Sequence, residues 1–322
     1  MPFPTTAGIT QRPELASMLE FDILAAEQGF VAGLVLPSLD VAHQSNDIGK
    51  LPIEELLKEQ LTARTSSGGY NRNVTRFEKF SYATEEHGVE EVVDDRDREI
   101  WREYLDADEI AMRRAADRIL RAYEKRVADA VFDTATWSTA ALKTAVTNEW
   151  DDATNATPIS DVNDAIKKVY DNSGLRANTL IINWKVYRNL IRVAQIIDQV
   201  KYSGMTNPNQ LSPNVLAEVF NIDRVIVAGS VRNSAAEGQV ATVSPVWSNE
   251  FAMICKTAMS RDPREACIGR TFHFAADGSQ INGVVEQYRD EPVRADIFRV
   301  RHETDEVIMY AQAGHLLENI TT

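Results

Sequence analysis

Apolar residues recur at helical spacing in one long stretch of the chain. Between residues 106 and 132, intervals of 4, 3, 4 and 4 define an apolar stripe formed by Ala116, Leu120, Tyr123, Val127 and Val131. Polar side chains occupy the other side, at Arg113, Asp117, Arg121 and Glu124. Asp106 and Glu109 have the spacing of a capping box, which predicts where the helix begins. The stretch therefore predicts a helix of about 27 residues, roughly 40 Å long.

From about residue 160 the pattern predicts alternating helices and strands. Ser160 is a candidate N-cap for an amphipathic helix that ends at Gly174. Two short apolar runs, Thr179–Asn183 and Arg224–Ala228, are typical of buried strands. Between them, a short helix is expected over Asn214–Phe220. A longer helix before it presents Val186, Leu190, Val193, Ile197 and Val200.

The C-terminal part of the chain is rich in strand-like segments. They are Phe251–Thr257, Gly269–Phe274, Gly283–Tyr288, Ala295–His302 and Glu306–Tyr310. Turn residues at 277–278 and at 290–292 separate them. This part of the chain therefore predicts a sheet.

The N-terminal part has a different character. Residues 1–46 contain scattered apolar positions and four prolines, which indicates an arm rather than a compact unit. Within the arm, Glu14–Gln28 predicts a short helix and Gly29–Leu36 (GFVAGLVL) predicts a buried strand.

Residues 47–93 predict an extended ribbon. Pro52 opens a short amphipathic helix, and Thr65–Tyr70 is typical of a turn. Val74–Tyr82 has strand composition with poor alternation, which suits a strand that touches different neighbours on its two sides. The acidic run 84–97 predicts a solvated face or loop.

Composition narrows the class of protein. With 34 basic and 48 acidic residues the net charge is −14, so the chain has no basic face with which to read a nucleic acid sequence. An acidic container would still surround DNA and repel it. The most apolar stretch is too short for a membrane span, which needs about 20 residues. Cys255 and Cys267 form neither a disulfide framework nor a zinc motif, which predicts buried thiols in a reducing compartment.

No catalytic constellation stands out, so we expect no enzyme, no cofactor and no metal site. The sequence contains no glycine-rich phosphate loop and no nucleophile elbow. Gly229 follows a predicted strand, but no further glycine follows closely enough to form a phosphate loop. The pairs Asp94/Asp95 and Asp151/Asp152 could bind a divalent ion in principle, although adjacent acids are usually solvated loop residues.

Five blocks of sequence carry a resemblance to a known family. In chain order they cover residues 29–41, 121–137 (RAYEKRVADAVFDTATW), 178–202, 211–235 and 284–320. Together they resemble the major capsid proteins of tailed bacteriophages, with the Hong Kong phage type of capsid fold. The second block is similar to the end of that family's spine helix, and the next two are similar to its A-domain.

The resemblance implies an α+β fold with the family's parts in order. Residues 1–46 would be the N-terminal arm and 47–93 the extended loop, or E-loop. Residues 94–154 and 250–322 would form the P-domain, with a long spine helix and a β-sheet. Residues 155–249 would form an α/β A-domain.

The function implied is that of a major capsid (head) protein. Its copies would self-assemble into pentamers and hexamers of an icosahedral shell that encloses double-stranded DNA without sequence-specific binding and without a membrane. The family's partners are a scaffolding protein and a portal. Because the chain starts almost directly at the arm, we expect a separate scaffolding protein. Such a protein would reside in the virion capsid after assembly in the host cytoplasm.

Two alternatives stay open. An encapsulin-type compartment has the same fold but carries a cargo enzyme, and a soluble α/β enzyme would have a pocket of perturbed acids or histidines. If the chain is a shell subunit, its arm and ribbon would bury apolar groups on neighbouring copies. The candidate assembly residues are Phe21, Phe30, Gly68, Gly69, Phe77, Phe80 and Tyr82.

Overall fold

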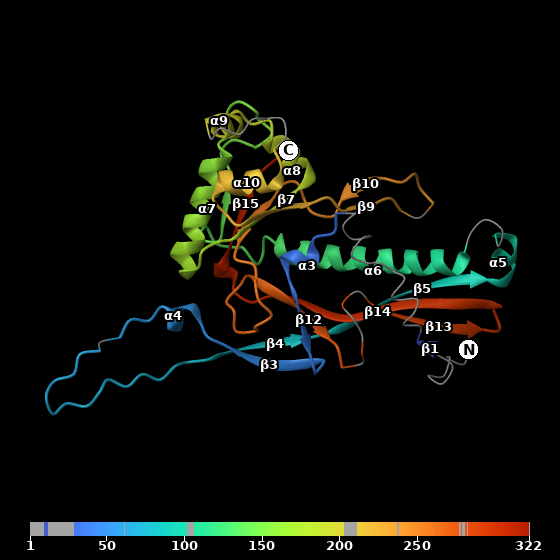
Figure 1. Ribbon diagram of the computed structural model, residues 1–322, viewed down its shortest axis with the longest axis horizontal. Helices are drawn as coiled ribbons and strands as arrows, with labels where there is room; N and C mark the ends of the chain where they lie inside the picture. Colours follow the sequence, from blue (N-terminus) through green and yellow to red (C-terminus); the bar gives the residue numbers. More distant parts are fainter. Residues whose placement is uncertain are drawn as a thin grey trace.

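The computed structural model describes residues 10–11, 29–60, 62–101, 106–202, 211–236, 238–276, 278, 281 and 283–321. Within these residues, the body consists of two sheets with their helices, and a long ribbon reaches away from the body (Figure 1). No helix among these residues is long and apolar enough to cross a membrane.

The first sheet is packed against one long helix, α6 (Ala107–Val131). Its central strand, β14 (Ala295–Ile308), runs antiparallel to all three strands with which it pairs. The other strands are β1 (Thr10–Gln11), β2 (Ser38–Val41), β5 (Glu85–Asp94), β12 (Gly269–Phe274) and β13 (Val284–Asp290). The order is β1-β13-β14-β12-β2. Strand β5 pairs with the first part of β14, from Ala295 to Thr304, and β12 pairs with the last part, from Thr304 to Ile308.

The second sheet has the order β6-β15-β11-β7-β8 and lies among the remaining long helices (Figure 1). Its strands are β6 (Lys143–Ala145), β7 (Thr179–Asn183), β8 (Arg224–Ala228), β11 (Ala252–Cys255) and β15 (Gly314–Glu318). The helices are α7 (Pro158–Ser173), α8 (Trp184–Leu190), α9 (Ala194–Tyr202) and α10 (Pro213–Phe220).

Two small antiparallel pairs complete the described fold. One is β9 (Val231–Asn233) with β10 (Val243–Pro245), and the other is β3 (Ser45–Lys50) with β4 (Glu78–Ala83). The short helical segments are α3 (Ala32–Val35), α4 (Ile53–Leu56), α5 (Asp95–Trp101) and η2 (Ala311–Ala313).

The long helix confirms the prediction made from its apolar stripe. The Asp106 side chain accepts hydrogen bonds from the amides of Asp108 and Glu109, and all five stripe residues are buried. Two i,i+4 ion pairs, Glu109–Arg113 and Asp117–Arg121, form along this helix. One prediction was wrong, because Glu124 was placed on the polar side and is instead fully buried.

Glu124 is buried because it joins three separate parts of the chain. Its carboxylate accepts hydrogen bonds from the amides of Val31 and Ala32, from the Ser230 hydroxyl and from the Trp247 indole. Burial raises the pKa of Glu124, and the hydrogen bond from Trp247 and those from the two amides oppose that rise. The residue therefore ties the start of α3 and the links that follow β8 and β10 to the middle of α6.

A strand predicted for one short segment and a loop predicted for another were wrong for the same reason, although the solvated face also predicted for the acidic run is present, since Glu85, Glu86 and Glu90 are exposed. GFVAGLVL forms a turn of helix, α3, instead of a strand, and four of its residues are buried against α6 and the second sheet. The acidic run forms strand β5, since Val93 and the partly buried Val89 pack on α6 while Glu91 pairs with Arg118 of that helix. Local composition does not reveal which surface a neighbouring element will cover.

Other boundaries shift by a few residues. Helix α7 begins at Pro158 after Thr157 rather than at Ser160, and it ends at Gly174 in the left-handed conformation as predicted. The helix expected after β7 is divided into α8 and α9. The last two predicted strands are one strand, β14, and β15 was not predicted. The helix expected over residues 14–28 lies outside the described residues.

The Glu124 contacts predict a large effect of a small substitution. In Glu124→Gln one carboxylate oxygen becomes an NH2 group, which cannot accept from the buried donors. We expect the free energy of unfolding to fall by about 2 kcal/mol, measured by urea denaturation of the unassembled chain. Glu109→Gln, on the same helix and 41% exposed, should change it by less than about 0.5 kcal/mol. Equal losses in both variants would contradict the role assigned to Glu124.

A second prediction concerns pH. His302 is fully buried, its Nδ1 lies 3.0 Å from the carbonyl of Ile281 and its Nε2 lies 3.1 Å from Arg126, so the neutral ring donates to the first and accepts from the second. Burial and then the Arg126 charge lower the pKa of His302 to about 3. The unfolded chain therefore binds this proton first as pH falls, and stability present above about pH 6.5 is lost below it.

We expect this group to cost about 2 kcal/mol of stability between pH 7 and pH 5. His302→Gln should flatten the pH dependence of the urea midpoint over that interval, whatever its effect at pH 7. His43→Gln, which changes an exposed imidazole, is the control. An unchanged slope in the His302 variant would refute the assignment.

Candidate assembly surface

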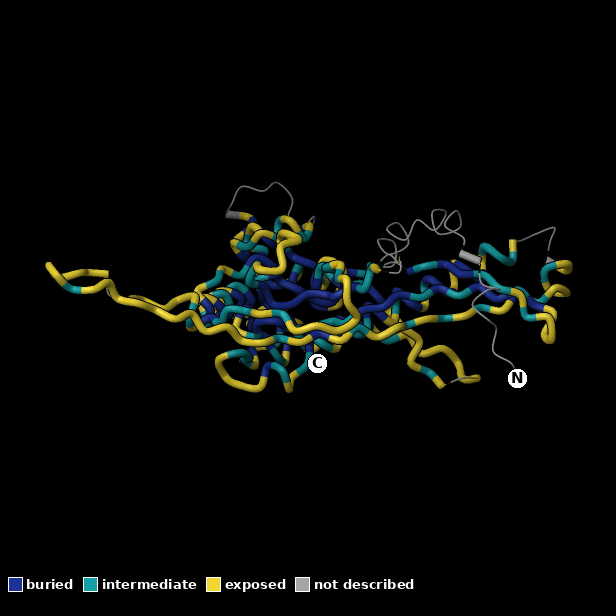
Figure 2. Tube along the Cα trace, turned by 90° about the horizontal axis from the view of Figure 1, so that it is seen from below, coloured by how far each residue is buried: buried dark blue, intermediate teal, exposed yellow. Residues whose placement is uncertain are grey.

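Residues 45–83 form the ribbon, a hairpin that projects beyond the rest of the molecule (Figures 1 and 2). Strands β3 and β4 pair antiparallel from Ser45↔Ala83 to Lys50↔Glu78 and form its base. Beyond α4, residues 62–77 form no helix or strand and nearly all of them are exposed. The ribbon thus has an anchored base and a free limb.

Aromatic packing fixes the base to the body. The Tyr82 ring is stacked on Phe272 of β12 with centroids 4.8 Å apart, and Phe80 contacts the same ring at 5.6 Å. The Tyr82 hydroxyl donates to the carbonyl of His43, and the Tyr310 hydroxyl donates to that of Leu51. These contacts bury Tyr82 and hold both strands at a defined place on the first sheet.

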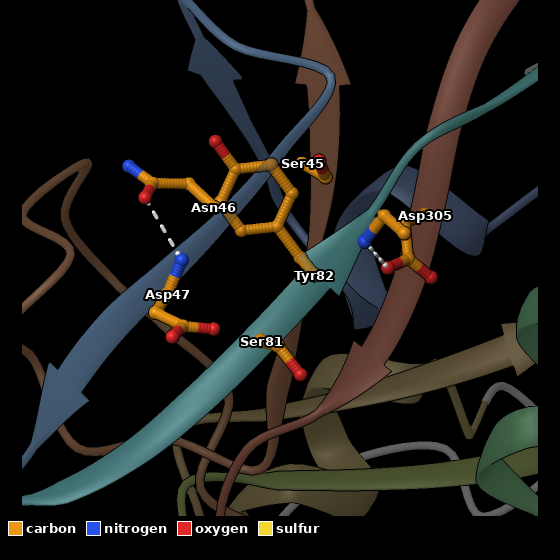
Figure 3. A pocket seen from close by; sticks show the side chains of 7 residues that line it. Ser45, Asn46, Asp47, Ser81, Tyr82 and Asp305 are labelled. Atoms are coloured by element: carbon orange, nitrogen blue, oxygen red, sulfur yellow. Dashed lines mark hydrogen bonds between the residues drawn. The ribbon is translucent and has the colours of Figure 1, made fainter.

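A polar hollow of about 670 Å³ lies beside this base (Figure 3). It is lined by Ser45, Asn46, Asp47, Ser81, Tyr82, Ala83 and Asp305. Asp305 accepts a hydrogen bond from the Ala83 amide at 2.9 Å, and burial raises the pKa of Asp305 in spite of that bond. The lining has no paired nucleophile and base, so it offers hydrogen bonds rather than catalysis.

The free limb has apolar side chains that the described part of the chain leaves exposed. The exposed fractions are 74% for Tyr70, 81% for Val74 and 69% for Phe77. Few local contacts shape the limb. Arg64 lies over the Tyr70 ring and donates to the carbonyl of Gly68, and Lys58 donates to Asn73. Such a surface is typical of an interaction site.

The predicted assembly residues fall into distinct places. Phe77 is on the free limb, and Gly68 and Gly69 are at its tip, where the Gly68 amide bonds to the carbonyl of Thr65. Phe80 and Tyr82 anchor the base within their own chain. The role of each in assembly remains a prediction.

The two remaining cases lie in the arm. Phe30 is partly buried beside α6, with the Arg121 guanidinium 5.5 Å from its ring. Phe21 lies outside the described residues. Sequence reasoning missed Tyr70 and Val74 as assembly candidates. Their signal was available, because each is a large apolar residue in a segment with no consistent periodicity.

The residues considered for other chemistry have structural partners. Asp94 accepts from the Arg96 amide, Asp95 pairs with Arg289, and Asp152 accepts from the amide of Thr154. In the described part of the chain, no three His, Cys, Asp or Glu residues gather as a metal site would require. Cys255 and Cys267 are free and buried, as predicted, and burial raises the pKa of both thiols.

Gly229 marks a crossing of two chain segments. Its amide donates to the carbonyl of Gly29, and a Cβ on Gly29 would lie 3.1 Å from the Gly229 Cα. Gly29 also has a φ of +68°, which few other residues adopt. The glycines therefore allow the arm to pass close to the second sheet.

No family profile matches the chain. The chain is similar to the major capsid protein of Burkholderia phage BcepMu, with 22% identity over 297 residues, which is 90% of this chain and 91% of the relative. Similarity to solved structures extends over nearly the whole length. A phage-related protein from Bordetella bronchiseptica RB50 superposes with a TM-score of 0.68 and 19% identity, covering 97% of this chain and 98% of that one.

The capsid of Myoviridae phage XM1 superposes with a TM-score of 0.55 and 9% identity, covering 91% of this chain and 92% of that one. This chain has the tailed-phage capsid fold. The same capsid fold also relates it to the SrpI encapsulin of Synechococcus elongatus PCC 7942, with a TM-score of 0.51 and 10% identity over 99% of this chain and 91% of that one. The expected resemblance and the α+β fold are confirmed.

Replacing a tyrosine by alanine should reduce the free energy of unfolding strongly at the base of the ribbon and hardly at all on its limb. Tyr82→Ala removes the ring stacked on Phe272, and we expect a loss of about 3 kcal/mol in the free energy of unfolding. Tyr70→Ala removes an exposed ring and should change it by less than about 0.5 kcal/mol. Urea denaturation of the two unassembled variants measures both. A comparable loss at Tyr70 would show that the limb packs on its own chain.

Proposed function

We propose that this chain is a major capsid protein whose copies form the pentamers and hexamers of an icosahedral shell around double-stranded DNA. The fold supports this proposal, as does the similarity to a phage protein named as a major capsid protein. The observation that carries it is the ribbon, which projects beyond the body (Figure 2) and leaves Tyr70, Val74 and Phe77 exposed. The shell would be built in the host cytoplasm and would remain in the virion.

The physical basis of assembly is burial of the limb on a neighbouring copy. Each 100 Å² of apolar surface removed from water contributes roughly 2.5 kcal/mol. Ordering the limb and losing rigid-body freedom offset a large part of that gain. Anchoring by Tyr82 lowers the ordering cost, because the base already has one direction before a neighbour binds. Assembly should therefore depend steeply on concentration.

The family's parts would map onto the chain as follows. Residues 1–46 would be the arm and 155–249 the A-domain, and 94–154 with 250–322 would form the P-domain. We propose that the E-loop ends near residue 84 rather than 93, since β5 pairs along β14 for ten residues. A scaffolding protein and a portal would be the partners, as the resemblance to the capsid family implies.

The net charge of −14 fits a container for DNA better than a DNA reader. An encapsulin-type compartment remains a second candidate, favoured by the superposition on the SrpI encapsulin. The contents of the shell distinguish the two. Shells from a phage lysate would protect DNA from nuclease, whereas an encapsulin would retain a protein cargo.

The test is assembly of the purified chain, alone or co-expressed with the neighbouring head genes. We expect closed shells by cryo-electron microscopy above a threshold concentration. Replacing residues 58–76 with a short Gly/Ser turn should abolish shells while circular dichroism and urea denaturation stay close to those of the full chain. Shells of normal size from the shortened variant would contradict the role of the ribbon, and a persistent monomer from the full chain would contradict the proposed function.

A further inference from the structure

Strand β5 forms a long edge of the first sheet. Among the described residues no strand pairs with the outer side of β5, although its inner side pairs with β14 from Glu85 to Asp94. Unpaired edges of this length readily recruit another strand. The side chains that point away from α6 include Glu90, Val92 and Asp94, and Val92 is 56% exposed. Val92 is more exposed than Val89 and Val93 of the same strand, so a further segment packed beside β5 would bury apolar surface.

The returning limb of the ribbon has the complementary pattern. Residues 71–77 belong to no helix or strand and are all exposed. In an extended conformation Arg72, Val74 and Arg76 would share one face. Neither guanidinium has an ion-pair or hydrogen-bond partner within the part of the chain that the structure describes. The segment 62–77 contains three arginines and no acid, in a chain whose net charge is −14.

We propose that residues 72–76 of one copy add as a strand to the β5 edge of a second copy, with Val74 opposite Val92. Arg72 and Arg76 would then flank Val74 on the added strand, just as Glu90 and Asp94 flank Val92 on β5. Because both patterns are symmetric about the valine, the charges match in either strand direction. This inference rests on the proposed function, since it names the surface that receives the ribbon.

The pairing cannot be made within one chain. The segment continues directly into β4, whose Glu78 pairs with Lys50 of β3, and this hairpin projects away from β5 (Figure 1). A second copy is therefore required. Glu90 already accepts hydrogen bonds from Arg299 and Tyr288, but its side chain is still 42% exposed and can accept another donor. Opposite charges would also steer the limb towards this edge.

Cysteine trapping tests the register. Directly opposite residues of paired strands have Cβ atoms about 4.5–5.5 Å apart, close to disulfide distance. The full chain carrying Val74→Cys and Val92→Cys should give a ladder of crosslinked oligomers on non-reducing gels when shells form under mild oxidation. The native Cys255 and Cys267 are fully buried and should give no background.

The matched control is Thr75→Cys with Val92→Cys, because Thr75 would point to the other face. Crosslinks in the first variant and few in the second would support the proposal. Intact shells without crosslinks, or equal crosslinking in both variants, would overturn it and leave the proposed function standing. If the unmodified chain forms no shells, the proposed function itself fails.

A second measurement covers the case in which the cysteine variant does not assemble. Val92→Asp places a third acid beside Glu90 and Asp94 and should raise the threshold concentration for shells at least about five-fold, with unchanged circular dichroism. Val240→Asp, at a site 90% exposed between β9 and β10, is the control and should leave the threshold near that of the unmodified chain. An unchanged threshold in the Val92 variant would overturn the proposal.

Discussion

The packing of α6 against both sheets is the constraint on which the rest of the structure depends. Its first half, from Ala111 to Leu120, closes the core beneath the first sheet. Its second half, from Tyr123 to Val131, belongs to a core that also contains Ile181 of the second sheet. One rigid helix therefore sets the positions of both sheets. Glu124 lies at the start of the second half, where the residues before α3 meet the helix.

This arrangement explains how a buried charge can be tolerated in the middle of a helix. Burying a lone carboxylate is costly, but four donors from three segments surround Glu124. Removing any one segment would leave the carboxylate short of partners. The residue thus favours a single arrangement of arm, helix and second sheet, and a well-defined subunit is what a closed shell requires.

The ribbon differs from the body, because only its base is held by buried contacts with the rest of the chain. Its base is anchored by the buried Tyr82 ring, which is stacked on Phe272, whereas its limb leaves Val74 and Phe77 in water. A chain that folded only for its own stability would bury such residues or replace them. Their exposure makes physical sense where another copy covers them, and the fixed base determines the direction in which the limb reaches.

The sequence by itself determined the elements whose periodicity is strong. The long helix, β7, β8 and the glycine stop of α7 follow from apolar spacing, caps and short apolar runs, which depend on neighbours along the chain. It also indicated an extended segment over residues 47–93, which is too long at its C-terminal end because β5 begins at Glu85, and it placed Phe77 and the tip glycines within that segment. The tertiary structure decided what depends on contacts between distant segments. Only packing against α6 makes a helix of residues 32–35 and a strand of the acidic run at β5. Glu124 is buried only because three distant segments, which contain Val31, Ser230 and Trp247, meet at α6. Likewise, local sequence could not separate Tyr82, which anchors the ribbon, from Tyr70, which is exposed on it, because the difference lies in whether Phe272 is within reach.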